Sequence, residues 1–175
     1  QLLPILSKML DEEKEYYSFL TLNSMRKKLS KDTRVIEVND LGAGSKKLKS
    51  NNRTVYGIAN LSVKKPKYAE AIFRLIETCQ SNNVIELGTS LGVTTGYMAM
   101  ANLKGKITTI EGCSETAKIA KENFNLVNIR NVNLLEGNFD DVLPEVLKGI
   151  ELFDFVFVDG NHTFDATMRY FNLFK

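Results

Sequence analysis

Residues 84–100, "VIELGTSLGVTTGYMAM", join a short apolar segment, a glycine-containing turn and the start of a helix. The run from Val84 to Leu87 predicts a buried strand, because it is apolar, short and bounded by a turn. Gly88 and Gly92 allow the backbone between them to turn tightly and to approach a ligand closely. The helix that follows offers unpaired N–H groups at its first turn. This stretch therefore predicts a ligand-binding loop at the carboxyl end of a strand.

The alternation of strand and helix continues to the end of the chain. Strands are predicted over residues 84–87, 106–110, 132–135 and 153–158. Helices are predicted over residues 66–79, after Gly92, from an N-cap at Ser114, over residues 142–147, and from Phe164 onward. Four strands alternating with helices indicate an α/β fold, a doubly wound parallel sheet with helices on both faces.

The N-terminal part of the chain follows a different pattern. Residues 4–30 carry apolar residues at helical spacing and predict one amphipathic helix, whereas the polar residues 41–63 predict a loop. We therefore divide the chain into an N-terminal helical and loop extension, residues 1–65, and an α/β domain, residues 66–175.

A second glycine-rich stretch, "VNDLGAGSKK" at residues 38–47, competes for the role of ligand loop. It leads into "SKKLKSNNRT", which is too polar and basic to open a packed helix. Glu111, by contrast, ends the strand that follows the first stretch, where a carboxylate can accept hydrogen bonds from both ribose hydroxyls. We therefore assign the ligand to the loop after residue 87 and interpret residues 38–47 as a structural loop. Because Gly88-Thr89-Ser90 is not Gly-x-Gly, the dinucleotide fingerprint of dehydrogenases is absent.

The overall charge does not favour nucleic acid or membrane as a partner. The net charge is +2, and no apolar run approaches the length of a membrane span. Basic residues cluster only locally, at Lys46, Lys47, Lys49 and Arg53 and at Lys64, Lys65 and Lys67. A solvated surface and a docking patch for RNA or protein both explain these clusters.

Two cysteines and one histidine cannot form a Cys/His zinc site. Cys79 and Cys113 also show no disulfide-rich pattern. Two unpaired thiols and no signal peptide favour the cytoplasm.

Four stretches in sequence order resemble the motifs of class I S-adenosylmethionine-dependent methyltransferases. "VIELGTSLGVTT" resembles their motif I, "ITTIEG" their motif II, and "LLEGNFDDVLPEV" the segment that contacts adenine. "FDFVFVDGNHTFDAT" resembles the fourth-strand motif, as Asp-Gly-x-His, of a subgroup related to small-molecule O-methyltransferases. Residues 1–80 more loosely resemble an N-terminal extension of some bacterial relatives. The resemblance implies a Rossmann-like sheet and S-adenosyl-L-methionine as cofactor.

On this resemblance, the cofactor-binding residues are Glu86, Gly88, Thr89, Ser90, Gly92, Glu111, Gly112, Asn138, Phe139 and Asp159. Glu86 would hold a water or the amino end of the methionine moiety, and Thr89 and Ser90 would bond its carboxylate. Glu111 would bind the ribose diol. Asn138 and the Phe139 N–H would contact adenine. Turn capping by Thr89 and Ser90, a solvated strand end at the two glutamates and a core position for Phe139 remain open alternatives.

Asp159 and His162 are the candidate catalytic residues. The sulfonium of the cofactor is already a strong electrophile, so the protein has to place the acceptor and remove its proton. His162 is the single histidine and follows Asp159 closely, which makes it the candidate base. A histidine that caps the following helix remains an alternative. So does a divalent metal at Asp159, as in catechol-type relatives, which needs further ligands from the next strand.

The sequence stops at Lys175, after the fourth strand and its helix, whereas the family's sheet continues. We therefore expect a sheet truncated after the fourth strand, or completed by another chain. An uncovered edge exposes unpaired backbone groups, so we expect self-association. The resemblance implies methyl transfer to an oxygen of a small molecule. An RNA or protein methyltransferase and a cofactor-binding scaffold without activity are the alternatives.

Overall fold

The computed structural model describes residues 2–39 and 50–175 of the chain. Within these residues the main sheet has four strands, in the order β5-β4-β3-β6, and every pairing is parallel. The strands are β3 (Asn83–Leu87), β4 (Lys106–Glu111), β5 (Val132–Glu136) and β6 (Phe155–Val158). The order reverses at β3, which has β4 on one side and β6 on the other. This reversal is the switch point at which open α/β sheets bind their ligands.

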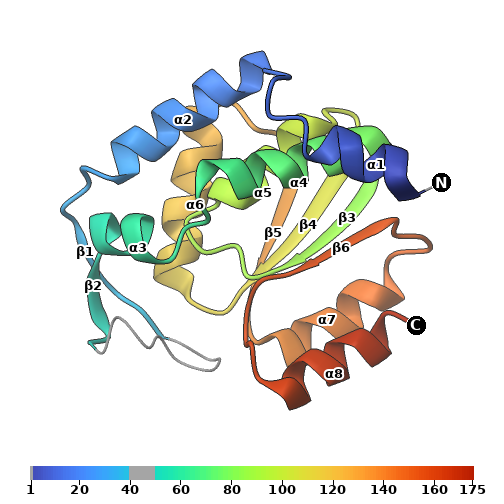
Figure 1. Cartoon of the computed structure of the whole chain (residues 1–175). Coiled ribbons are helices and arrows are strands. Elements are labelled where there is room, and N and C mark those ends of the chain that lie inside the picture. The colour runs from blue at the N-terminus through green and yellow to red at the C-terminus, as the bar shows by residue number, and fades with distance from the viewer. Residues whose placement is uncertain (1, 40–49) are drawn as a thin grey trace.

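Helices cover both faces of this sheet. One face carries α4 (Pro66–Cys79), α5 (Val93–Ala101) and α6 (Ser114–Leu126), and the other carries α7 (Phe139–Lys148) and α8 (Phe164–Leu173) (Figure 1). Each face of the sheet has its own hydrophobic cluster. Adjacent residues of β3 belong to different clusters, because successive side chains of a strand point to opposite faces. Val84 packs in a cluster with Met98 of α5, and Ile85 packs with Leu143 of α7. The predicted Rossmann-like α/β fold is confirmed.

The single helix predicted over residues 4–30 is wrong. The chain forms α1 (Leu2–Met9) and α2 (Tyr17–Leu29), with a break between them. In the break, the Asp11 Oδ1 atom accepts hydrogen bonds from the N–H groups of Glu13 at 3.2 Å and Lys14 at 3.3 Å. These side-chain bonds stabilise a turn in place of a continuing helix.

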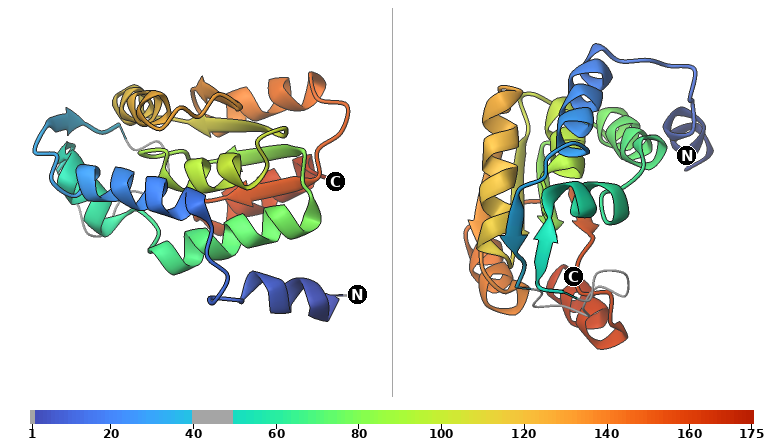
Figure 2. Two further views of the ribbon diagram at one scale, coloured as in Figure 1. Left: turned by 90° about the horizontal axis from the view of Figure 1, so that it is seen from above. Right: turned by 90° about the vertical axis from the view of Figure 1, so that its left-hand side faces the viewer.

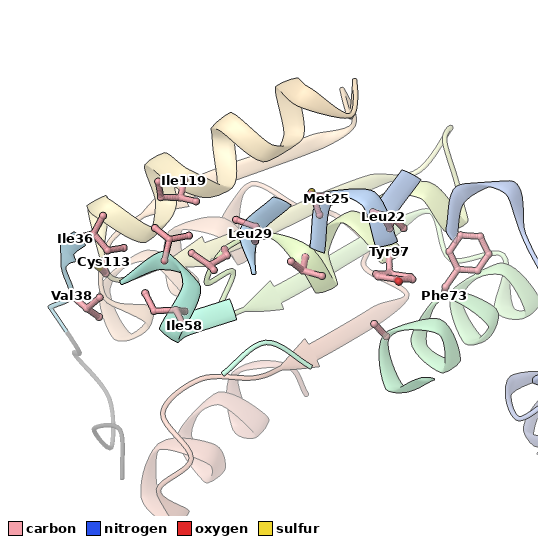
Figure 3. Packing of buried hydrophobic residues seen from close by; sticks show 14 of the residues in the cluster. Leu22, Met25, Leu29, Ile36, Val38, Ile58, Phe73, Tyr97, Cys113 and Ile119 are labelled. Carbon is pink, nitrogen blue, oxygen red and sulfur yellow. The ribbon is translucent and has the colours of Figure 1, made fainter. Parts of the chain in front are cut away.

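The N-terminal helices pack onto the α/β layer. α2 lies against α5, and α1 lies against α4 (Figure 2). Figure 3 shows Leu22 and Met25 of α2 beside Tyr97 of α5, and all three side chains are buried. A Cβ atom added to Gly96 would lie 3.0 Å from Leu22 Cδ2, so the two helices are in close contact. Residues of the predicted extension and of the predicted α/β domain therefore share one hydrophobic cluster.

The loop predicted over residues 41–63 is wrong from residue 52 onward. β1 (Val35–Glu37) pairs antiparallel with β2 (Asn52–Thr54), and α3 (Val55–Leu61) follows directly. The Thr54 side chain caps α3 by accepting a hydrogen bond from the Gly57 N–H at 3.0 Å. Most of the stretch "VNDLGAGSKK" lies outside the described residues.

Several helices and strands begin at other residues than predicted. The start of α4 at Pro66 is confirmed, but the N-cap of α6 is Cys113 rather than Ser114. α7 begins before the predicted residue 142, because Asn138 caps it by accepting a hydrogen bond from the Asp140 N–H at 3.1 Å. β6 begins after the predicted residue 153, since the Asp154 carboxylate accepts hydrogen bonds from two backbone N–H groups beside β3.

β6 lies at one end of the sheet, as predicted for the fourth strand. It pairs with β3, and its other edge has no partner strand among the described residues. In the same part of the chain, no helix combines the length and apolar character needed to cross a membrane.

We predict that Gly92→Ala lowers the free energy of unfolding by about 1–3 kcal/mol. Gly92 has φ +78°, and an added Cβ atom would lie 2.7 Å from Phe124 Cε1 of α6. The substitution therefore strains the backbone and also forces α5 away from α6. Urea denaturation of both proteins measures the change.

Gly149→Ala is the matched control. Gly149 has φ −94°, and an added Cβ atom would meet nothing closer than 3.7 Å. We expect its free energy of unfolding to stay within about 0.5 kcal/mol of the unchanged protein. An equal loss in both variants would contradict this account of the turn after β3.

Candidate active site

A cleft of about 340 Å³ opens at the carboxyl ends of β3, β4 and β6. Most of the predicted site residues line it: Gly88, Ser90, Glu111, Gly112, Asn138, Phe139, Asp159 and His162. Glu86, Thr89 and Gly92 do not line it. Glu86 and Thr89 are buried beneath it, and the open side of Gly92 faces α6. The fold thus brings together segments that are far apart in the sequence.

The turn after β3 presses against the end of β6. Gly88 has φ +102°, and an added Cβ atom would lie 2.7 Å from the carbonyl oxygen of Asp159. Only glycine therefore fits between these two strand ends without a shift of the backbone. Gly88 lines the cleft and has no side chain, which leaves room for a ligand above the backbone there.

The Glu111 carboxylate joins two loops of the cleft. Its Oε2 atom accepts a hydrogen bond from the Ser90 N–H at 2.7 Å, and its Oε1 atom accepts one from the Cys113 N–H at 2.9 Å. Each carboxylate oxygen can accept a further hydrogen bond. The group is therefore held in one orientation and can still bind a diol.

Glu86 lies directly below this region and is fully buried. Its Oε2 atom accepts hydrogen bonds from the hydroxyls of Thr95 and Thr109, each at 2.6 Å, and Thr109 in turn is 2.6 Å from the Thr89 hydroxyl. The Oε1 atom has no partner among the described residues. Burial raises the pKa of the Glu86 carboxyl to about 8. An unpaired buried oxygen of this kind fits a water molecule or a ligand amine.

The start of α7 forms a flat polar wall of the cleft. Asn138 is the N-cap of α7, and the Phe139 N–H, at the first position of the helix, has no acceptor within the helix. The Phe139 ring packs edge-on against Tyr170, with 5.9 Å between ring centroids. This wall offers a side-chain amide and a backbone donor to a planar heterocycle.

Asp159 and His162 lie at the end of β6. The His162 Nε2 atom is 3.8 Å from Asp159 Oδ1, and the His162 side chain is 69% exposed. The alternative that His162 caps the next helix is wrong, because Thr163 caps α8 by accepting a hydrogen bond from the Ala166 N–H. His162 is therefore free to face the cleft.

Lys64 also reaches this point from the segment between α3 and α4. Its Nζ atom lies 2.8 Å from Asp159 Oδ1. The Lys64 ammonium group is therefore paired with a residue of the cleft, and the docking patch for RNA or protein stays a prediction. Lys65 and Lys67 are exposed, and Lys46, Lys47 and Lys49 lie outside the described residues.

The described residues by themselves do not complete a metal site at Asp159. They bring together no group of three or more His, Cys, Asp and Glu side chains in a geometry suited to a metal ion. The Asp159 Oδ1 atom already accepts a hydrogen bond from the Lys64 ammonium group.

The sequence did not predict that the N-terminal part lines the cleft. Five of its residues do so, namely Val38, Asn39, Arg53, Ile58 and Ser62. Arg53 lies in β2 and Ile58 in α3, whereas Val38, Asn39 and Ser62 lie in the segments that follow β1 and α3. All five fall within residues 38–47 and 41–63, which were predicted as loops. The short strands and helix of this region give little periodicity, so only the glycine-rich stretch beginning at Val38 hinted at such a role.

Comparisons with known proteins show that the chain is similar to methyltransferases. A family model described as a methyltransferase domain matches residues 85–175. A catechol O-methyltransferase of Niastella koreensis is 30% identical over 115 residues, an alignment that covers 64% of this chain and 52% of the relative. The chain thus spans about half the length of this curated relative.

Solved structures share the fold at low sequence identity. An O-methyltransferase from Bacillus cereus, in complex with SAH, has a TM-score of 0.64 at 19% identity, covering 93% of this chain and 62% of that one. An O-methyltransferase of tomaymycin synthesis from Streptomyces achromogenes, in complex with SAM, has a TM-score of 0.62 at 21% identity, covering 91% of this chain and 60% of that one.

We predict that the stability of the protein depends on the ionisation of Glu86. The pKa of Glu86 is about 8 in the folded protein, against 4.5 for an unperturbed glutamate. Between these values the folded protein keeps a proton that the unfolded chain has released. The free energy of unfolding should therefore fall by up to a few kcal/mol as the pH rises from about 4.5 to about 8.

Glu86→Gln tests this dependence. The glutamine cannot ionise, and its amide oxygen still accepts from Thr95 and Thr109. The variant should therefore gain stability relative to the unchanged protein as the pH rises. Urea denaturation across this pH range measures both proteins, and parallel pH dependences would show that Glu86 does not hold the proton.

Proposed function

Because the chain belongs to the class I methyltransferase family, whose domain model matches residues 85–175, we propose that it transfers a methyl group from S-adenosyl-L-methionine to an oxygen of a small molecule. One observation carries the proposal. The Glu111 carboxylate is fixed by two backbone N–H groups at the open end of the sheet, beside the turn after β3. This arrangement suits the ribose diol of a nucleoside cofactor.

The other parts of the cofactor follow from this position. The Asn138 side chain and the Phe139 N–H would contact the adenine, and Gly112 would lie beside the ribose. The methionine end would extend over Gly88 towards Ser90 and the N-terminus of α5, where unpaired N–H groups favour a carboxylate. The unpaired Glu86 Oε1 atom is buried beneath the cleft and fits a water, which would lie between it and the amino group of this end. Thr89 and Gly92 would support the turn from behind.

Asp159 and His162 would serve the acceptor. The bound cofactor supplies an electrophilic methyl group, so the protein has to align the acceptor oxygen and take up its proton. His162 would act as the general base, which contributes a factor of about 10²–10⁴. Asp159, at 3.8 Å, would stabilise the charged imidazole.

The two parts of the chain would then have different tasks. We propose that residues 66–175 hold the cofactor and that residues 1–65 close one side of the cleft, since five of them line it. The relative described as a catechol O-methyltransferase supports a hydroxyl acceptor of small size. We place the reaction in the cytoplasm, which the free thiols of Cys79 and Cys113 support.

We predict that S-adenosylhomocysteine binds with micromolar affinity and that Glu111→Gln weakens binding about 10-fold or more. The substitution replaces one acceptor oxygen by a donor, and a ribose hydroxyl then loses its partner, which costs about 1–3 kcal/mol. Isothermal titration calorimetry measures both affinities.

Glu136→Gln is the matched control. Glu136 ends β5 in register with Glu111 on β4, but it is paired with Lys121 and does not line the cleft. Its substitution should leave the affinity unchanged. Equal weakening by both variants, or no binding by the unchanged protein, would contradict the proposed cofactor site.

We also propose that this chain self-associates through β6. Phe155–Val158 is an apolar strand at one end of the sheet, and an unpaired edge of this kind favours pairing with another strand. Multi-angle light scattering should give a mass above 19.7 kDa that rises with protein concentration. A constant monomer mass at micromolar concentration would contradict this proposal.

A further inference from the structure

We propose that Lys64 is a positioning residue of the active site, whose ammonium group holds the Asp159 carboxylate and occupies the place that a divalent cation would take beside it. The inference rests on the proposed function and extends it to the segment between α3 and α4. That segment belongs to the part of the chain that the family model does not match.

The contact is built into the fold rather than formed by chance on the surface. The Nζ–Oδ1 distance is 2.8 Å, and the two side chains are 28% and 24% exposed. The exposed pair of Lys148 and Glu145, by comparison, leaves about 70% of each side chain in water. Partial burial reduces screening by solvent, so the Lys64 pair is the stronger of the two.

A second contact fixes the same ammonium group. The Lys64 Nζ atom lies 5.4 Å from the centre of the Phe157 ring, on the same strand end as Asp159. A cation over an aromatic ring is attracted by the electrons of the ring. Both contacts of Lys64 therefore hold it at the carboxyl end of β6.

The backbone that carries Lys64 is also held in place. Ile58 of α3 and Ala69 of α4 are buried in the same hydrophobic cluster on either side of the segment. Ser62, two residues before Lys64, lines the cleft. The segment thus forms part of the cleft wall, and its Lys64 ammonium group lies beside Asp159.

The position of Lys64 has two consequences for Asp159. The carboxylate is held in one orientation, and its Oδ1 atom is shared between Lys64 and the more distant His162. A divalent cation bound at the same oxygen would lie next to the ammonium group and be repelled by it. Lys64 therefore favours a metal-free Asp159.

Lys64→Met tests the proposal, because methionine is an unbranched side chain one atom shorter than lysine and carries no charge. Lys64→Arg retains the charge, and Lys65→Met removes a neighbouring, exposed charge as the matched control. Circular dichroism confirms that each variant is folded. We expect Lys64→Met to lower kcat by about 10- to 100-fold, Lys64→Arg to recover part of it, and Lys65→Met to leave it unchanged.

A second readout does not depend on activity. His162 is the single histidine, so the Cε1–H proton of its ring gives one NMR signal that can be assigned directly. Lys64→Met should shift this signal, and Lys65→Met should not. Millimolar Mn²⁺ should leave the signal sharp in the unchanged protein. In Lys64→Met it should broaden the signal, because Asp159 no longer pairs with Lys64 and can bind the paramagnetic ion close to His162.

The proposal is overturned if Lys64→Met leaves the His162 signal and kcat unchanged, or if Mn²⁺ broadens the signal equally with and without Lys64. If the unchanged protein transfers no methyl group, the proposed function fails. The NMR readouts still decide whether Lys64 holds Asp159.

Discussion

The bridge from Glu111 to the backbone of Ser90 and Cys113 is the interaction on which the site depends. It joins the turn after β3 to the loop after β4, and it turns the carboxylate towards the cleft. The turn itself is held from behind, by the buried bonds among Thr89, Thr109 and Glu86. A single rigid unit thus presents both the backbone N–H groups and the carboxylate that a nucleoside cofactor needs.

The remaining walls come from segments that are distant in the sequence. α7 supplies Asn138 and Phe139, and the end of β6 supplies Asp159. The described residues of the N-terminal part that line the cleft are Val38, Asn39, Arg53, Ile58 and Ser62. The N-terminal part shares a hydrophobic cluster with α5, so its position relative to the cleft is fixed by packing. Lys64 belongs to this part as well, and its ammonium group pairs with Asp159, a residue that lines the cleft.

Much of this arrangement could be predicted from the sequence, and the limits have physical reasons. The strands from 84 onward are short apolar runs between turns, and parallel strands bring their carboxyl ends to one edge, so Gly88, Glu111 and Asp159 could be placed together. The break at Asp11 was missed because a local side-chain bond overrides helical periodicity. The pairing of Lys64 with Asp159 could not be predicted, since it joins residues 95 positions apart through tertiary packing alone.

We propose that the cofactor lies in the cleft after β3, with its ribose on Glu111. A crystal structure of the protein with S-adenosylhomocysteine tests it most directly. We expect both ribose hydroxyls to lie within hydrogen-bond distance of the Glu111 carboxylate and the adenine to reach the Phe139 N–H. A ligand bound elsewhere, or one whose ribose does not contact Glu111, would contradict it.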